Sequence, residues 1–273
     1  MLLNLHNAAA EIPSARLQIS AGKDAKSVRA GSYANRSGLL IITFASSKGG
    51  VGKSTATASI AGAFAKAGLN VHIIDLDSNK TVSRWFADKK TRPRNITVST
   101  PDPEKLTEHL QEVAVKQGPD IILIDVAGTY ERALTHAIAR AHLTIIPAGT
   151  SEADIYEAGR VAQHLRQVFA AFNRKPLYRL LLTRIQPIVS HAQRHAYGEI
   201  NRLKLPLFRS LLAHRAAYEE IGLSGLPPHF ADQKRETVAK AVNELDALKE
   251  EIEVIIGLKA DGKAVSALRK AQA

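Results

Sequence analysis

The sequence predicts an α/β fold: a mostly parallel twisted sheet with helices on both faces. Runs of apolar residues alternate along the chain with longer helical stretches. Several of these runs are apolar throughout rather than at every second position. Strands of that kind are buried on both sides, as they are in a parallel sheet covered by helices.

Apolar runs are expected to form the strands of this sheet. The run at 39–45 reads Leu-Leu-Ile-Ile-Thr-Phe-Ala, and the run at 121–125 reads Ile-Ile-Leu-Ile-Asp. Neither alternates between apolar and polar residues, as a strand with one wet face would. The expected strands span residues 39–45, 71–76, 96–99, 121–125, 143–148 and 179–182.

Helical stretches fill the intervals between the strands. The stretch after the first strand is rich in alanine. Ser151 followed by Glu152 and Asp154 is typical of a helix N-cap with acidic residues in the first turn. The expected helices span residues 53–67, 81–87, 103–116, 131–141, 152–172, 189–203 and 237–256.

The chain is divided into one domain and two flanking segments. A length of 273 residues accommodates one large α/β domain, which we expect at residues 39–257. Residues 1–38 show no sustained period and predict a flexible N-terminal arm. Residues 258–273 predict a C-terminal tail or short helix. Its apolar residues are mostly alanine, so we expect no stable membrane anchoring.

Composition narrows the class of protein further. The chain has no cysteine, which excludes disulfides and thiolate-bound metals or clusters. It has neither an apolar stretch of the roughly 18 residues that a membrane span needs nor a convincing signal peptide. We therefore expect a cytoplasmic protein. The formal net charge of +11 suggests a polyanionic partner, with nucleic acid first.

Residues 47–55, Ser-Lys-Gly-Gly-Val-Gly-Lys-Ser-Thr, lie between the first strand and the first helix. Glycines let the backbone turn tightly and approach an anion, and the helix start adds its positive dipole end. The segment predicts a phosphate-binding loop (P-loop) for ATP. The nucleotide-binding residues are expected to be Gly49, Gly50, Val51, Gly52, Lys53, Ser54 and Thr55.

Carboxylates at two strand ends predict a magnesium site beside this loop. Asp125 ends the apolar strand that follows the loop farther along the chain, a pattern typical of Mg²⁺ binding in P-loop proteins. Asp75 and Asp77 end the second strand, where a carboxylate can hold Mg²⁺ or orient water. The expected metal ligands are Ser54, Asp75 and Asp125. Alternatively, Asp75 and Asp77 cap the next helix.

The pattern Lys48-Gly-Gly-x-Gly-Lys53-Ser54 resembles the deviant Walker A motif of the ParA/MinD family of ATPases. The resemblance covers roughly residues 39–230. It implies a homodimer formed with ATP, in which Lys48 crosses the interface to the partner's nucleotide. It also implies slow, Mg²⁺-dependent ATP hydrolysis with Lys48, Lys53 and Asp77 as the catalytic residues.

Two further positions, Asp77 and Gly128, resemble elements of the family pattern. The resemblance gives Asp77 the role of positioning or activating the attacking water. Ser78 and Asn79 follow where the family usually has Pro-Gln. Gly128 resembles a glycine whose amide senses the γ-phosphate, and it can equally be a turn residue.

Most of the excess positive charge lies in one segment. Residues 174–215 contain nine basic residues and one acidic residue. Few aromatic residues interleave, so contact with duplex phosphates fits better than stacking on single strands. The alternative is a set of solvated helix faces. The candidate DNA-binding residues are Arg184, Arg194, Arg202, Lys204, Arg209 and Arg215.

The resemblance implies a ParA-like function. A dimer with ATP would bind DNA nonspecifically on the nucleoid and drive plasmid or chromosome partition. A centromere-binding adaptor protein would stimulate hydrolysis. Alternatives are a VirC-type ATPase of conjugative DNA transfer and the positioning of protein cargo on the nucleoid. A MinD-like membrane ATPase is disfavoured by the tail, and a metabolic P-loop enzyme is disfavoured by Lys48 and the charge.

Overall fold

The computed structural model describes residues 39–127, 131–186 and 190–257. Their strands form one sheet in the order β3-β2-β4-β1-β5-β6. Every neighbouring pair is parallel, so the predicted fold class is confirmed. The strands are β1 (Leu40–Ser46), β2 (Val71–Asp75), β3 (Ile96–Ser99), β4 (Ile121–Ala127), β5 (Leu143–Ala148) and β6 (Tyr178–Leu182).

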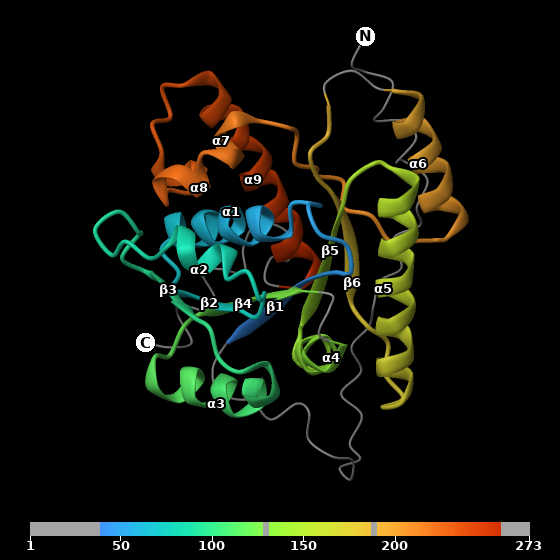
Figure 1. The fold of residues 1–273 in the computed structure, drawn as a ribbon, viewed down its shortest axis with the longest axis horizontal. Coiled ribbons are helices and arrows are strands. Elements are labelled where there is room, and N and C mark those ends of the chain that lie inside the picture. The colour runs from blue at the N-terminus through green and yellow to red at the C-terminus, as the bar shows by residue number, and fades with distance from the viewer. Residues whose placement is uncertain (1–38, 128–130, 187–189, 258–273) are drawn as a thin grey trace.

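Helices cover both faces of the sheet (Figure 1). One face carries α1 (Lys53–Lys66), α2 (Thr81–Trp85), α7 (Ala216–Glu219), α8 (Ile221–Ser224), the 3-10 turn η3 (Pro228–Phe230) and α9 (Glu236–Ile255). The other face carries α3 (Leu106–Lys116), α4 (Glu131–Arg140), α5 (Glu152–Ala170) and α6 (His191–Arg202). A 3-10 turn, η2 (Pro103–Lys105), precedes α3.

The two layers explain why the strands are apolar throughout. On β1, Ile42 and Phe44 belong to the core shared with α1 and α9. Their neighbours Ile41 and Ala45 belong to the core shared with α4 and α5. Because successive side chains point to opposite faces of a strand, both sets must be apolar when both faces are covered.

The strand register gathers three functional segments at one edge of the sheet. Asp75 of β2 lies opposite Asp125 of β4, and Asp125 lies opposite Phe44 of β1. The P-loop begins just beyond β1. The carboxyl ends of parallel strands therefore bring both aspartates next to the loop, as the positions of ligand sites in such sheets lead one to expect.

The sequence missed several elements between α6 and α9. α7, α8 and η3 are too short for a helical period to be visible. Residues 206–213 run beside β6: Phe208 N–H donates to Leu180 O at 2.9 Å, and Leu212 N–H donates to Leu182 O at 2.9 Å. α2 ends at Trp85, two residues earlier than expected.

The predicted arm at 1–38, the predicted tail at 258–273 and Gly128 lie outside the described residues. Within the described residues, no helix has the length and apolar character to cross a membrane.

A buried histidine joins β2 to the edge strand β3. His72 is 1% exposed, and its Nδ1 and Nε2 atoms pair with the hydroxyls of Thr97 and Ser99 at 2.7 and 2.8 Å. The Ser99 hydroxyl also pairs with His109 Nε2 of α3 at 2.7 Å. Burial, with a smaller contribution from His109, lowers the pKa of His72 to about 4.

This histidine should make folding stability fall at acid pH. The unfolded chain, with a His pKa near 6.5, binds the proton more readily than the folded protein does. Stability is therefore lost as pH falls from about 6.5 towards 4, by about 2 kcal/mol at pH 5. Urea unfolding at pH 7.5 and 5 should show this loss, and His72→Gln should reduce it. His109→Gln, which leaves His72 in place, should retain most of it. An unchanged pH dependence in His72→Gln would refute the assignment.

Candidate nucleotide site

The P-loop is shaped by two glycines and held by the neighbouring strand. Gly50 and Gly52 have φ of 79° and 81°, a region that favours glycine, and Gly52 is the N-cap of α1. The buried Thr183 hydroxyl, just past β6, donates to Val51 O at 2.6 Å. Arg184 Nη1 donates to Gly50 O at 2.7 Å. The loop backbone is therefore fixed from outside as well as by its own turns.

Lys53 connects three elements of the site. Its ammonium lies 2.6 Å from Asp125 Oδ1 and 3.3 Å from Asp77 Oδ2. The Lys53 side chain is 9% exposed and that of Asp125 is 0% exposed. Burial works against the charged lysine, but Asp125 and then Asp77 outweigh it and raise the pKa of Lys53. The predicted phosphate lysine and the two carboxylates thus meet at one point.

Ser54 and Asp125 provide oxygens suited to Mg²⁺. The Ser54 hydroxyl donates to Asp125 Oδ2 at 2.7 Å. A hydroxyl and a carboxylate at the start of a phosphate-binding helix are the ligand types that Mg²⁺ takes together with phosphate oxygens and water. The Asp125 carboxylate already lies beside one cation, the Lys53 ammonium. Its position therefore suits the binding of positive charge.

Asp75 has a different environment from the other two aspartates. Its Oδ1 accepts from Asp77 N–H at 3.1 Å, and its Oδ2 accepts from Ser83 N–H at 2.9 Å. Burial raises the pKa of its carboxyl. Both oxygens therefore bind the backbone of the segment leading into α2. This is the helix-capping arrangement that the sequence left open, and the metal-ligand role of Asp75 stays a prediction.

Lys48 points to its own chain rather than to a phosphate. Its ammonium lies 2.6 Å from Asp154 Oδ1 at the start of α5. Asp154 also forms a capping box with Ser151. Burial raises the pKa of the Asp154 carboxyl, but hydrogen bonds from Lys48 and Ser151 outweigh this and lower it. A hydrogen bond of 2.7 Å from Ser47 to Glu157 attaches the same half of the loop to α5.

A pocket of about 410 Å³ opens beside the loop, a volume suited to a nucleotide. The glycines, Lys53, Ser54, Thr55 and Asp77 line its phosphate end. The remaining wall comes from residues that the sequence did not single out for this role. They are Asn79, Thr81, Trp85, Thr183, Leu212, Ala213, His214, Tyr218 and Glu219, together with Arg184 and Arg215.

The carboxylate of Glu244, on α9, holds several residues of that pocket wall in place. Glu244 Oε1 accepts from Arg215 Nε at 2.9 Å, and Glu244 Oε2 accepts from the Tyr218 hydroxyl at 2.8 Å and from Ala213 N–H at 3.2 Å. Burial, with the charge of Glu244 next, raises the pKa of Tyr218. No local sequence motif pairs residues this far apart, so this arrangement could not be predicted.

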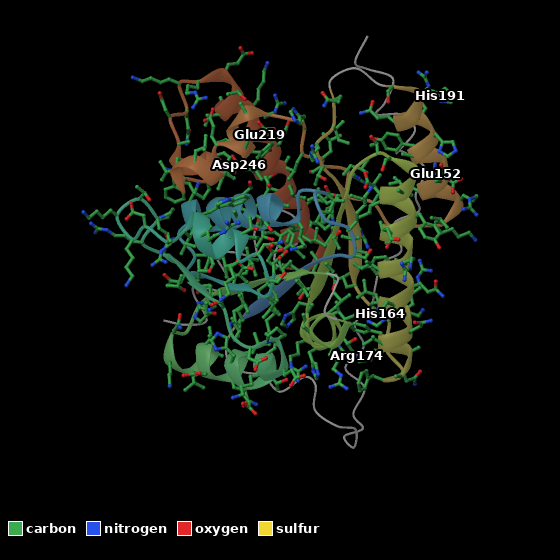
Figure 2. The ribbon with its side chains drawn as sticks, in the orientation of Figure 1. Glu152, His164, Arg174, His191, Glu219 and Asp246 are labelled. Atoms are coloured by element: carbon green, nitrogen blue, oxygen red, sulfur yellow. The ribbon has the colours of Figure 1, made fainter. Side chains whose placement is uncertain are left out.

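The six predicted DNA-binding residues differ in their surroundings. Arg184 contacts the P-loop, Arg215 pairs with Glu244, and Arg202 pairs with Glu199 at 2.7 Å. Arg194, Lys204 and Arg209 are exposed. Figure 2 shows Arg174, which lies just past the end of α5, and His191, which begins α6, at opposite ends of the α5 and α6 side of the molecule.

These features define a nucleotide-binding protein of the P-loop class, in which a central strand leads through a glycine loop into a helix. The sequence matches the CobQ/CobB/MinD/ParA nucleotide binding domain over residues 42–228, and the chain belongs to this family. The family predicted from the two-lysine loop is thereby confirmed.

Known proteins resemble this chain over 43% to 82% of its length. Protein ParA of Rhizobium radiobacter is 26% identical over 211 residues, which cover 76% of this chain and 93% of that protein. Protein virC1 of the same organism is 33% identical over 121 residues, which cover 43% of this chain and 52% of that protein. The septum site-determining protein MinD complexed with Mg-ADP, from Pyrococcus horikoshii OT3, has a TM-score of 0.62 at 21% identity, covering 82% of this chain and 99% of that one.

The pairing of Lys53 with Asp125 predicts a measurable coupling in the protein without nucleotide. Lys53→Met leaves a buried carboxylate without its cation and should lower the free energy of unfolding by about 3–5 kcal/mol. The double variant Lys53→Met/Asp125→Asn removes the charge as well and should recover much of that loss. Urea unfolding measures both. Equal stability of the single and double variants would show that the Asp125 charge is not what Lys53 neutralises.

Proposed function

We propose that this protein is an ATPase of DNA partition, which forms a dimer with ATP, binds duplex DNA nonspecifically and hydrolyses ATP slowly when an adaptor protein stimulates it. The observation that carries the proposal is the pair of lysines in the P-loop. Lys53 lies among buried carboxylates, whereas Lys48, 40% exposed at its side chain, lies at the outer side of the loop. The family and the ParA relative support the same reading.

The residues of the site divide the work of phosphoryl transfer among them. The loop amides and Lys53 would bind the phosphates, with Lys53 exchanging Asp125 for the β- and γ-oxygens. Ser54 and Asp125 would hold Mg²⁺, which when bound neutralises phosphate charge. Asp77, 3.3 Å from Lys53, would orient the attacking water. Little covalent chemistry is required, because positioning and charge stabilisation dominate this reaction.

Lys48 would link hydrolysis to assembly. It cannot serve a partner's nucleotide while it pairs with Asp154 of its own chain, so dimer formation would exchange one anionic contact for another. The Lys48–Asp154 pair within one chain would therefore compete with dimer formation. The competition is weak, since a partly exposed ion pair contributes at most about 1 kcal/mol.

A DNA-transfer ATPase is the second candidate. The 33% identity to virC1 favours this candidate. The match covers only 52% of that protein, so this candidate has less support than the first one. Both candidates need ATP-dependent DNA binding, and they differ in cargo. Deleting the gene should lower plasmid retention in the first case and the frequency of conjugative transfer in the second.

Co-sedimentation tests the proposed function directly. The full chain should pellet with duplex DNA when ATP is present and much less with ADP or with no nucleotide. It should not pellet with liposomes that contain anionic lipid. ATP-dependent binding to liposomes but not to DNA would instead support a membrane ATPase.

Lys48→Ala should separate nucleotide binding from its consequences. The variant should bind ATP, because the phosphate contacts of Lys53 and the loop amides remain, but it should lose ATP-dependent dimerisation and hydrolysis. Light scattering and phosphate release measure these. Lys80→Ala, which removes an exposed lysine near the pocket, serves as the control. Normal dimerisation of Lys48→Ala would refute the role of Lys48.

Asp154→Asn should favour the dimer by releasing Lys48 while keeping a side chain that can cap α5. We expect the ATP concentration at half-dimerisation to fall by roughly two- to fivefold, as expected for a partly exposed ion pair. Ser151→Ala removes the capping hydroxyl and leaves the Lys48–Asp154 pair in place, so it should not cause this fall. A midpoint that rises in Asp154→Asn would contradict the competition.

A further inference from the structure

The connection between α2 and β3 is a strongly basic surface outside the segment that the sequence favoured. Residues 80–94 contain six basic residues and one acidic residue. We call five of them the basic turn: Arg84 in the last turn of α2, and Lys89, Lys90, Arg92 and Arg94 of the connection itself. The turn projects from the side of the molecule in Figure 1, at the β3 edge of the sheet and away from α6.

The positive charges of the basic turn are available to a ligand. Arg84, Lys89, Lys90 and Arg94 are exposed, and within the described part of the chain none of them has a carboxylate partner. The one acid of the turn, Asp88, accepts from Lys90 N–H at 2.8 Å through Oδ1 and from Arg92 N–H at 3.0 Å through its carbonyl. It therefore organises the turn backbone instead of pairing with a side chain.

The turn is also ordered before any ligand arrives. At one end Phe86 is 1% exposed in the core. At the other end the Asn95 side-chain amide donates to Ala65 O at 2.8 Å and to Leu69 O at 2.7 Å, which ties the chain to the C-terminal end of α1. A preorganised loop loses less conformational entropy on binding. The basic side chains are thus presented from a fixed backbone.

The chemistry of the turn fits a phosphate backbone. Exposed Lys and Arg side chains without exposed aromatic neighbours match sequence-independent phosphate contacts. Membrane binding would need a bulky apolar face beside the charges. Phe86 and Pro93 are buried, and the exposed Leu223 on the adjacent α8 is a single leucine. Duplex DNA is therefore the favoured ligand.

The turn is joined to the nucleotide pocket by a single short helix. Trp85, the last residue of α2, lines the pocket together with Asp77. On its other side α2 packs closely on α8, since a Cβ at Gly222 of α8 would lie 3.0 Å from Trp85 Nε1. Any displacement of α2 by a nucleotide would be transmitted to the turn, because the helix and the turn are continuous in the chain.

We propose that the basic turn binds the phosphates of duplex DNA; this assignment rests on the proposed DNA-binding function and specifies a surface for it. Of the six residues predicted from the sequence, Arg184 contacts the P-loop, Arg215 lines the pocket wall, and the other four lie in α6 or in the segment that follows it. The basic turn instead holds its charges within the last turn of α2 and the connection that follows it, a few residues along the chain from Asp77.

Two double variants and a matched control test the surface. Lys89→Ala/Lys90→Ala removes two charges from the turn, and Lys204→Ala/Arg209→Ala removes two from the segment predicted earlier. Lys105→Ala/Lys116→Ala removes two from around α3, on the opposite face of the sheet. Anisotropy of a labelled random-sequence duplex, titrated with the full chain and ATP at several salt concentrations, measures affinity. An ATP-induced rise in the thermal midpoint confirms that each variant folds and binds nucleotide.

We expect the turn variant to bind at least about tenfold more weakly near 0.1 M salt, with a log–log salt slope shallower by about 1 to 2. The control should stay within about twofold of the wild type, and the Lys204/Arg209 variant should lose less than the turn variant. Wild-type-like binding by the turn variant would overturn the surface assignment alone. No DNA binding by the wild type would overturn the proposed function, and the assignment with it. ATP-dependent binding to anionic liposomes that the turn variant loses, with its DNA binding unchanged, would assign the turn to a membrane.

Discussion

The buried contact between Lys53 and Asp125 is the interaction on which the rest of the site depends. It joins the first residue of α1 to the end of β4 across the central strand. An ammonium and a carboxylate can be buried there only because each neutralises the other. The P-loop, α1 and β4 are therefore held together at this point by a contact within the chain itself.

The P-loop depends on several distant elements for its position. Thr183 and Arg184 hold its middle from the β6 side, and Asp154 and Glu157 of α5 hold its first half. Each of these contacts involves a residue more than one hundred positions away. A nucleotide that shifted the loop would also change its contacts with α5 and with the residues just past β6. The position of the loop is therefore coupled to both elements.

The sequence predicted what local patterns encode. Continuous apolar runs predicted the strands. The proximity of the loop, Asp77 and Asp125 was predicted from their order along the chain, because a parallel sheet brings the carboxyl ends of its strands together irrespective of the connecting loops. Tyr218 and Glu244 were not found, since their contact depends on how α7 packs on α9. The contacts of Arg184 with the P-loop and of Arg215 with Glu244 were not predicted either, since each joins residues far apart in the chain.

The place of Trp85 has an optical consequence. It is the only tryptophan of the chain, it is half-buried, and it lines the nucleotide pocket at the end of α2. Its emission therefore comes from one known position, and that position lies between the phosphate end and α8. Fluorescence of the unlabelled protein therefore reports on events at this end of the pocket, such as the arrival of a nucleotide.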